Sequence, residues 1–153
     1  MPHMMEHASR VLEGVNIMAD EAIIVELLGA DKGGDVVQYI VADGTAIAKG
    51  AILQLTDNRT AAASAADKVV AGIAATEKVA NDGETTIGCY TNGIFKLTDS
   101  GAGGVVGLSV VLGGVNTVKS AATSEDGRIF GKRLATAGAG AVEEVRVLVG
   151  KHY

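Results

Sequence analysis

The stretch ETTIGCYTNGIFKLT, residues 84–98, decides the fold that the sequence predicts. Its two halves are strand-length runs in which apolar and polar residues alternate, and they flank Asn92-Gly93. Asn-Gly is the strongest local signal for a tight β-hairpin, because both central residues of a type I′ turn need a positive φ. The sequence therefore predicts antiparallel strands at 84–91 and 93–98, joined at Asn92-Gly93.

Short apolar runs separated by glycine turns continue on both sides of this stretch. The chain has 21 glycines and one proline, and the glycines fall between the apolar runs, as turn residues do. The runs are of strand length and mostly rich in β-branched residues. They are 35–42, 51–56, 69–76, 84–91, 93–98, 107–113, 128–136 and 143–150. We expect a mainly β chain, a small single-domain β-barrel or sandwich (β-tulip-like) with an N-terminal arm or short helix.

The first thirty residues differ from the rest, so an N-terminal extension at 1–30 and a compact β domain at 31–153 are expected. The apolar run at 22–28 leads into a glycine-rich stretch. Two interpretations stay open: a short amphipathic helix followed by a strand, or an arm that becomes ordered only on a partner. The apolar residues at helical spacing are Val11, Leu12, Val15 and Met18.

Residues 70–90 and 129–148 share an order of features. Each segment has a glycine-containing strand that ends in Ala-Thr, then a glycine turn, and then a strand that begins at Glu. Either the chain contains a repeated hairpin, or glycine-rich β sequences share this pattern. Residues 60–70 are compatible with one helical turn.

Composition argues against several classes of function. The 153 residues carry a net charge of -5, and aromatic residues make up 3% of them, which is unlike a basic, aromatic nucleic-acid platform. No apolar run approaches the roughly 20 residues of a membrane span, and the first residues lack the pattern of a signal peptide. A soluble protein made in the cytoplasm, with no nucleic-acid or membrane partner, is expected.

Cys89 is the only cysteine, and its chemistry depends on its neighbours. Alternation places it on the same strand face as Ile87, the face expected to be buried. The histidines are His3, His7 and His152, close to the termini, so none is expected beside the thiol. A buried thiol without a cationic neighbour is inert. The sequence therefore predicts no enzyme, no catalytic residue, no metal site and no cofactor.

Two glycine-rich stretches fail the tests for phosphate loops. GRIFGKR at 127–133 has a Gly-Lys pair, but its first glycine is one residue too close, and Arg133 stands where Ser or Thr must ligate magnesium. GAGGVVG at 101–107 lacks the required glycine register. Both are expected to be turns.

VADGTAIAKGAILQL, residues 41–55, resembles half of a lipoyl or biotinyl carrier domain, and TEKVA, with Lys78, resembles the attachment hairpin of that family. The alternative function is therefore a β carrier or small ligand-binding domain of a cytoplasmic enzyme complex. In carriers the modified lysine follows closely after the glycine turn, whereas Lys78 lies 28 positions beyond Gly50. Lys78 is instead expected to be an exposed turn lysine.

A longer resemblance covers the chain from about residue 42. GTAIAKGAILQLTD, VVAGIAATEKVANDGETTIGCYTNGIFKL, GLSVVLGG and GRIFGKRLATAGAGAVEEVRVLVG follow one another in the order typical of a viral protein family. In these segments the chain resembles the small capsid decoration proteins, or head cement proteins, of tailed bacteriophages. It departs from that family in its longer N-terminal segment and at Arg133, where a small residue is usual.

The resemblance implies a structural protein of the virion, a homotrimer on the outer capsid surface. It would bind the expanded head where major capsid protein subunits meet, and stabilise the head against internal pressure. Apolar N-terminal residues and the rare large aromatic residues are the candidates for the capsid or subunit interface, although the first role expected of the aromatic ones is core packing and the interface is their alternative role. The candidates are Val11, Leu12, Val15, Ile17, Met18, Ile23, Ile24, Tyr39, Tyr90, Phe95 and Phe130.

Overall fold

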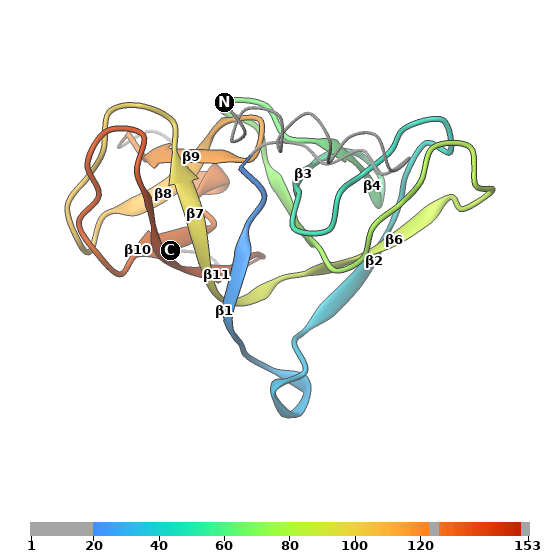
Figure 1. Cartoon of the computed structure of the whole chain (residues 1–153), viewed down its shortest axis with the longest axis horizontal. Helices are drawn as coiled ribbons and strands as arrows, with labels where there is room; N and C mark the ends of the chain where they lie inside the picture. Colours follow the sequence, from blue (N-terminus) through green and yellow to red (C-terminus); the bar gives the residue numbers. More distant parts are fainter. Residues whose placement is uncertain (1–19, 123–125, 151–153) are drawn as a thin grey trace, which may run out of the picture.

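The computed structural model describes residues 20–122 and 126–150, which form eleven strands and two short 3-10 helices. Ten strands close into two five-stranded barrels, and β1 (Ile23–Leu27) adds a further strand to the second barrel. Figure 1 shows the second barrel on the left, the first on the right and β1 between them. The predicted mainly β fold with a small barrel is confirmed, and the described chain holds two such barrels.

The first barrel has the strand order β2-β4-β3-β5-β6. Its neighbouring strands are antiparallel except β2 and β4, which run parallel where Ile40 pairs with Thr60. A 3-10 helix, η1 (Ala30–Lys32), precedes it. The strands are β2 (Val36–Ile40), β3 (Ile52–Asp57), β4 (Thr60–Ala63), β5 (Val70–Ala74) and β6 (Thr86–Tyr90).

The second barrel repeats this arrangement, with the order β7-β11-β10-β8-β9 closed by a parallel pairing of β7 with β9. The helix η2 (Asp126–Arg128) precedes β10. The strands are β7 (Asn92–Asp99), β8 (Ser109–Gly114), β9 (Thr117–Ser120), β10 (Gly131–Arg133) and β11 (Val142–Leu148).

The two barrels are an internal repeat. Strands β2 to β6 correspond in order to β7 to β11, with the same partners and the same directions. A two-way backbone bridge joins the loops of each barrel, Ile47 with Lys78 in the first and Gly104 with Ala137 in the second. The similarity between residues 70–90 and 129–148 is therefore a real repeat, and the repeated unit is a whole barrel and not one hairpin.

The hairpin predicted at Asn92-Gly93 is wrong. Strand β6 pairs with β2 and β5, whereas β7 pairs with β1, β9 and β11, so the chain passes from one barrel to the other at this point. Asn92 and Gly93 pair with Leu148 and Val147. Glycine is needed here for a close approach, since a Cβ on Gly93 would lie 2.8 Å from the carbonyl oxygen of Glu26 in β1.

The helical turn considered within residues 60–70 is also wrong, because Thr60–Ala63 form β4. This strand pairs with β3 through a tight turn at Asn58-Arg59, where Arg59 has a φ of 48°. At the N-terminal end, residues 23–27 form a strand that belongs to the sheet of the second barrel. Residues 1–19 lie outside the described residues.

Two apolar clusters fill the molecule, and the larger one joins the barrels. The first barrel is filled by small residues around Leu53, Ile87 and Cys89. The second cluster combines the interior of the second barrel with Ile52 and Ile73 of the first. The two barrels therefore share a core.

Hydrogen bonds also join the two barrels, and Asn116 takes part in two of them. The backbone N–H of Ile52 donates to Asn116 Oδ1 at 2.8 Å, and the backbone N–H of Asn116 donates to Ser64 Oγ at 2.8 Å. Asn116 has a φ of 57°, a conformation that asparagine tolerates better than most residues. The side chain thus satisfies a buried donor of the neighbouring barrel.

Candidate functional site

Cys89 lies in the core of the first barrel with 0% of its surface exposed. Ile87, on the same face of β6, is buried as well, as the alternation predicted. Burial raises the pKa of the Cys89 thiol to about 12. A thiol with this pKa carries almost no thiolate near neutral pH, so Cys89 is a packing residue and not a nucleophile.

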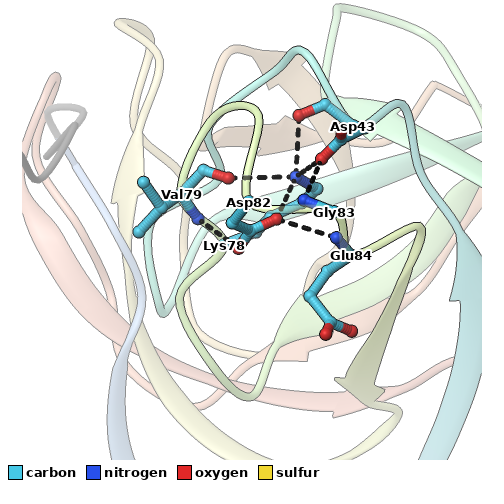
Figure 2. Close-up of polar contacts among 6 residues, drawn as sticks. All are labelled: Asp43, Lys78, Val79, Asp82, Gly83 and Glu84. Carbon is cyan, nitrogen blue, oxygen red and sulfur yellow. Dashed lines mark hydrogen bonds and ion pairs between the residues drawn. The ribbon is translucent and has the colours of Figure 1, made fainter.

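Lys78 is buried, so the expectation of an exposed turn lysine is wrong. Its Nζ donates to four oxygens from two loops, as Figure 2 shows. They are Asp43 O at 2.8 Å, Asp82 Oδ1 at 3.0 Å, Val79 O at 3.0 Å and Asp43 Oδ1 at 3.2 Å. The ammonium group therefore ties the β2–β3 loop to the β5–β6 loop.

The charges in this cluster stabilise each other. Burial alone lowers the pKa of Lys78, but its hydrogen bonds to Asp82 and Asp43 and their negative charges outweigh burial and raise it. The backbone N–H of Glu84 and the Lys78 ammonium hold the pKa of Asp82 below its usual range. Lys78 thus stays protonated, which is the opposite of what a nucleophilic amine needs.

The second barrel holds a different buried polar cluster around Arg133. This side chain has 0% exposure and lies between two carboxylates, with Nη2 3.0 Å from Asp99 Oδ1 and Nη1 in contact with Glu143 Oε2. Its Nε donates to Ser120 Oγ at 3.2 Å. Arg133 therefore acts inside the barrel, in agreement with the rejection of a phosphate loop at 127–133.

Asp99 also holds the loops at the end of the second barrel. Its Oδ2 accepts from the backbone N–H groups of Gly101, Gly103 and Gly140 at 2.8, 2.7 and 3.1 Å. Burial alone raises the pKa of Asp99, but these three donors and Arg133 outweigh burial and hold it below the usual 3.8. Burial raises the pKa of Glu143, even against the nearby guanidinium.

The repeat shows that both clusters have the same task. The loops that Asp99 holds correspond to the loops that Lys78 holds in the first barrel, and each pair carries one of the two backbone bridges. The register assigns Val41, Ala74 and Ile87 as the counterparts of Asp99, Arg133 and Glu143. In the first barrel the contacts of Lys78 therefore hold the loops together, and the barrel interior stays apolar.

Large aliphatic side chains on the surface are the remaining candidates for function, and the first group lies on β1. Ile23, Ile24 and Val25 are 57%, 40% and 42% exposed. We call these three residues the β1 surface. Beside it, Ile23 and Ile24 line a groove of about 270 Å³ with Gly50, Ile73 and Tyr90. This groove lies where β1 meets the first barrel.

A second group of aliphatic side chains lies on the turn before β8. Val105, Val106 and Leu108 are 56%, 56% and 42% exposed, and Leu134 beside them is 41% exposed. We call residues 105–108 with Leu134 the Gly107 turn, because Gly107 N–H donates to the carbonyl oxygen of Arg133 at its centre. The sequence analysis did not select these residues, although the run Val-Val-Gly-Leu between glycines could have drawn attention to them.

The predicted interface residues fall into three groups. Ile23 and Ile24 are exposed, and Tyr39 and Tyr90 are half-buried. Phe95 and Phe130 are 0% and 2% exposed inside the shared core, so of the two roles considered for them the structure shows packing. The candidates outside the described residues are Val11, Leu12, Val15, Ile17 and Met18.

Comparison with protein-family models gives no matching family, and comparison with curated proteins gives no match either. Within residues 20–122 and 126–150, no group of three or more His, Cys, Asp or Glu side chains is placed to hold a metal ion. The same part of the chain contains no helix long and apolar enough to cross a membrane.

Proposed function

We propose that this protein is a structural virion protein that binds the outer surface of the expanded capsid between major capsid protein subunits and stabilises the head. The protein would act as a homotrimer located in the virion, as expected from its resemblance to capsid decoration proteins. Its role would be adhesion, without bond-making chemistry.

The β1 surface is the observation that carries this proposal. Three consecutive aliphatic residues, Ile23 to Val25, are 40–57% exposed, although β1 pairs with β7 on both sides of an irregularity at Val25. A strand that presents aliphatic side chains to water is suited to binding another protein, because burying the exposed half of each one contributes roughly 1 kcal/mol. The strand also directly follows the apolar N-terminal segment.

The body behind this surface supports the proposal because it is stiff. The two barrels share one core, and the loops at their ends are pinned by the clusters around Lys78 and Arg133. The reactive side chains Cys89, Lys78 and Arg133 are buried and engaged in packing or ion pairs. Such a body transmits load between capsid subunits without yielding.

Binding to purified heads tests the proposal. The full chain should bind expanded, DNA-free heads of the virus that encodes it and should not bind compact procapsids. The double variant Ile23→Ser, Val25→Ser should bind expanded heads at least about tenfold more weakly. Val115→Ser is the matched control, since Val115 is 49% exposed on the second barrel, and it should bind like the wild type. Equal binding to both particle forms would count against the proposal.

The alternative, a carrier domain modified at Lys78, has no support in the geometry. Its Nζ is enclosed by four oxygen acceptors and its side chain is 2% exposed. A ligase would have to break these contacts to reach the amine. The intact mass of the chain after expression with a lipoyl or biotinyl ligase decides the matter, and an added lipoyl or biotinyl group on Lys78 would revive the alternative.

A further inference from the structure

The repeat allows each surface of one barrel to be compared with the same surface of the other. Strand β1 lies along β7, where Ile23 pairs with Lys96 and Glu26 with Ile94. The register of the two barrels gives Gln38 and Val36 as the counterparts of Lys96 and Ile94 in β2. In the described chain no strand pairs with β2 on this side, except β4 at Ile40.

Among the described residues, the side of β2 away from β6 is therefore a sheet edge without a partner strand before Ile40, and on this edge Arg59 Nη2 donates to Gln38 O at 2.7 Å. Thr91 N–H donates to Asp35 O and Val41 N–H donates to Thr85 O, so the alternating pattern of antiparallel pairing turns the amides of Val36 and Gln38 away from β6. Val36 is 45% exposed. We call residues 36–40 the β2 edge. Edges of this kind are ready to be covered by another protein chain.

The Gly107 turn gives the second comparison. Its counterpart in the first barrel is the turn at Gly50, which has the same left-handed φ, 90° against 93°, and the same N–H bond to the adjacent strand. The N-terminal segment covers the Gly50 turn, since Ala22 N–H donates to Gly50 O at 2.8 Å. Within the part of the chain that the structure describes, nothing lies within 4 Å of a Cβ built on Gly107.

The side chains of the two turns differ in a way that fits their surroundings. Residues 48–51 of the covered turn are Ala-Lys-Gly-Ala, and Ala48 and Ala51 are 4% and 1% exposed. Residues 105–108 of the uncovered turn are Val-Val-Gly-Leu, and its aliphatic side chains are more than 40% exposed. Larger apolar side chains stand where the first barrel has alanine and a covering strand.

Within the chain, residues 22–27 connect the Gly50 turn of the first barrel to the β7 edge of the second. The turn of one barrel thus lies near the first-strand edge of the next barrel. The Gly107 turn and the β2 edge are the same two surfaces at the two ends of the molecule. Suppose that a second copy is placed relative to the second barrel as the second barrel is placed relative to the first. The β2 edge of that copy would then lie at the Gly107 turn.

We propose that copies of this chain associate head to tail, with the Gly107 turn of one copy against the β2 edge of the next. The valine and leucine side chains of the turn would fill the space that residues 22–27 fill inside the chain. This heterologous contact leaves both surfaces covered if the copies close into a ring. The inference rests on the self-association in the proposed function and not on capsid binding.

A complementation experiment tests the proposal. The turn variant Val106→Glu, Leu108→Glu and the edge variant Val36→Glu, Ile40→Glu should each be monomeric in sedimentation, with association at least about a hundredfold weaker than in the wild type. Val36 and Ile40 are 45% and 50% exposed on the β2 edge. Their equimolar mixture should form dimers and nothing larger, because each mixed pair retains one intact turn and one intact edge. Val115→Glu is the control and should assemble like the wild type.

Three results would overturn the proposal: a monomeric wild type at high protein concentration, a turn or edge variant that still assembles, or a mixture that stays monomeric. Should a variant unfold, a cysteine pair replaces it, Val106→Cys with Val36→Cys in one chain, which should give disulfide-linked multimers on oxidation. Cys89 does not interfere, since it is buried. Monomers alone would contradict the arrangement. A turn variant that fails to assemble but binds heads would separate this inference from the proposed function.

Discussion

Arg133 is the residue whose surroundings differ most between the two barrels. It is enclosed with Asp99 and Glu143 where the first barrel has Val41, Ala74 and Ile87. Removing one member of a buried ion cluster leaves charges without a partner in a poorly solvated place. The cluster therefore makes the second barrel more sensitive to single substitutions here than the first.

Replacing Arg133 with methionine should lower the free energy of unfolding by about 3–5 kcal/mol, because two buried carboxylates lose their counter-charge. Lys132→Met is the matched control, since Lys132 is exposed on the same strand, and it should change stability by less than about 0.5 kcal/mol. Denaturant unfolding measures both. A loss below about 1 kcal/mol for Arg133→Met would contradict the role given to the cluster.

The lowered pKa of Asp99 predicts how stability changes with pH. A carboxyl group whose pKa is lower in the folded chain contributes stability above its unfolded pKa, and this contribution disappears as pH falls through the folded pKa. The cost of Asp99→Asn should therefore be full near pH 6 and should shrink below pH 3.8. Unfolding curves of both proteins over this range test it. A cost that stays constant down to about pH 2 would show that the Asp99 charge contributes nothing.

At the scale of elements, β1 depends on a glycine in its partner strand. Ala in place of Gly93 would put a Cβ 2.8 Å from Glu26 O, close to the irregularity in the pairing of β1 with β7. We expect Gly93→Ala to weaken amide protection in residues 24–27 and to cost about 1–3 kcal/mol. Gly138→Ala is the control, since nothing lies within 4 Å of its Cβ. Unchanged hydrogen exchange in β1 would contradict this account.

The sequence predicted the strands better than their partners. Each of the eight predicted strand segments overlaps an observed strand, because alternation and glycine turns are local signals. Strands β4 and β9 were missed because their sequences, Thr-Ala-Ala-Ala and Thr-Val-Lys-Ser, hold a single large aliphatic residue between them and so form no apolar run. The Asn92-Gly93 hairpin was wrong because pairing with Leu148 and Val147, more than fifty residues away, outweighs a local turn preference. The presence of two barrels could have been inferred only from the similarity between residues 70–90 and 129–148.

The candidate site was predicted in part. Burial of Cys89 followed from alternation with Ile87, which depends on the strand alone. The burial of Lys78 could not be predicted from local alternation, because Asp43 approaches Lys78 from a loop 35 residues earlier. For Phe95 and Phe130 both core packing and an interface stayed open, because composition does not tell a core aromatic residue from an exposed one. The exposed Gly107 turn could be recognised as unusual only by comparing it with the covered Gly50 turn of the first barrel.

The whole molecule is a tandem of two like barrels that share a core. Asn116 and the residues around Ile52 close the junction, and β1 crosses it by starting at the Gly50 turn and pairing with β7. The molecule is therefore a single rigid body with aliphatic surfaces at β1, at the Gly107 turn and at the β2 edge. The proposed function assigns the first surface to the capsid, and the further inference assigns the other two to neighbouring copies.

Electron cryo-microscopy of expanded heads with and without the protein tests the central claim most directly. The account predicts added density on the outer surface between major capsid protein subunits, in which the two barrels fit as one body and β1 faces the shell. Heads incubated with the Ile23→Ser, Val25→Ser variant should lack this density. Heads without added density after incubation with the wild-type chain, or density in which β1 faces away from the capsid, would contradict the account.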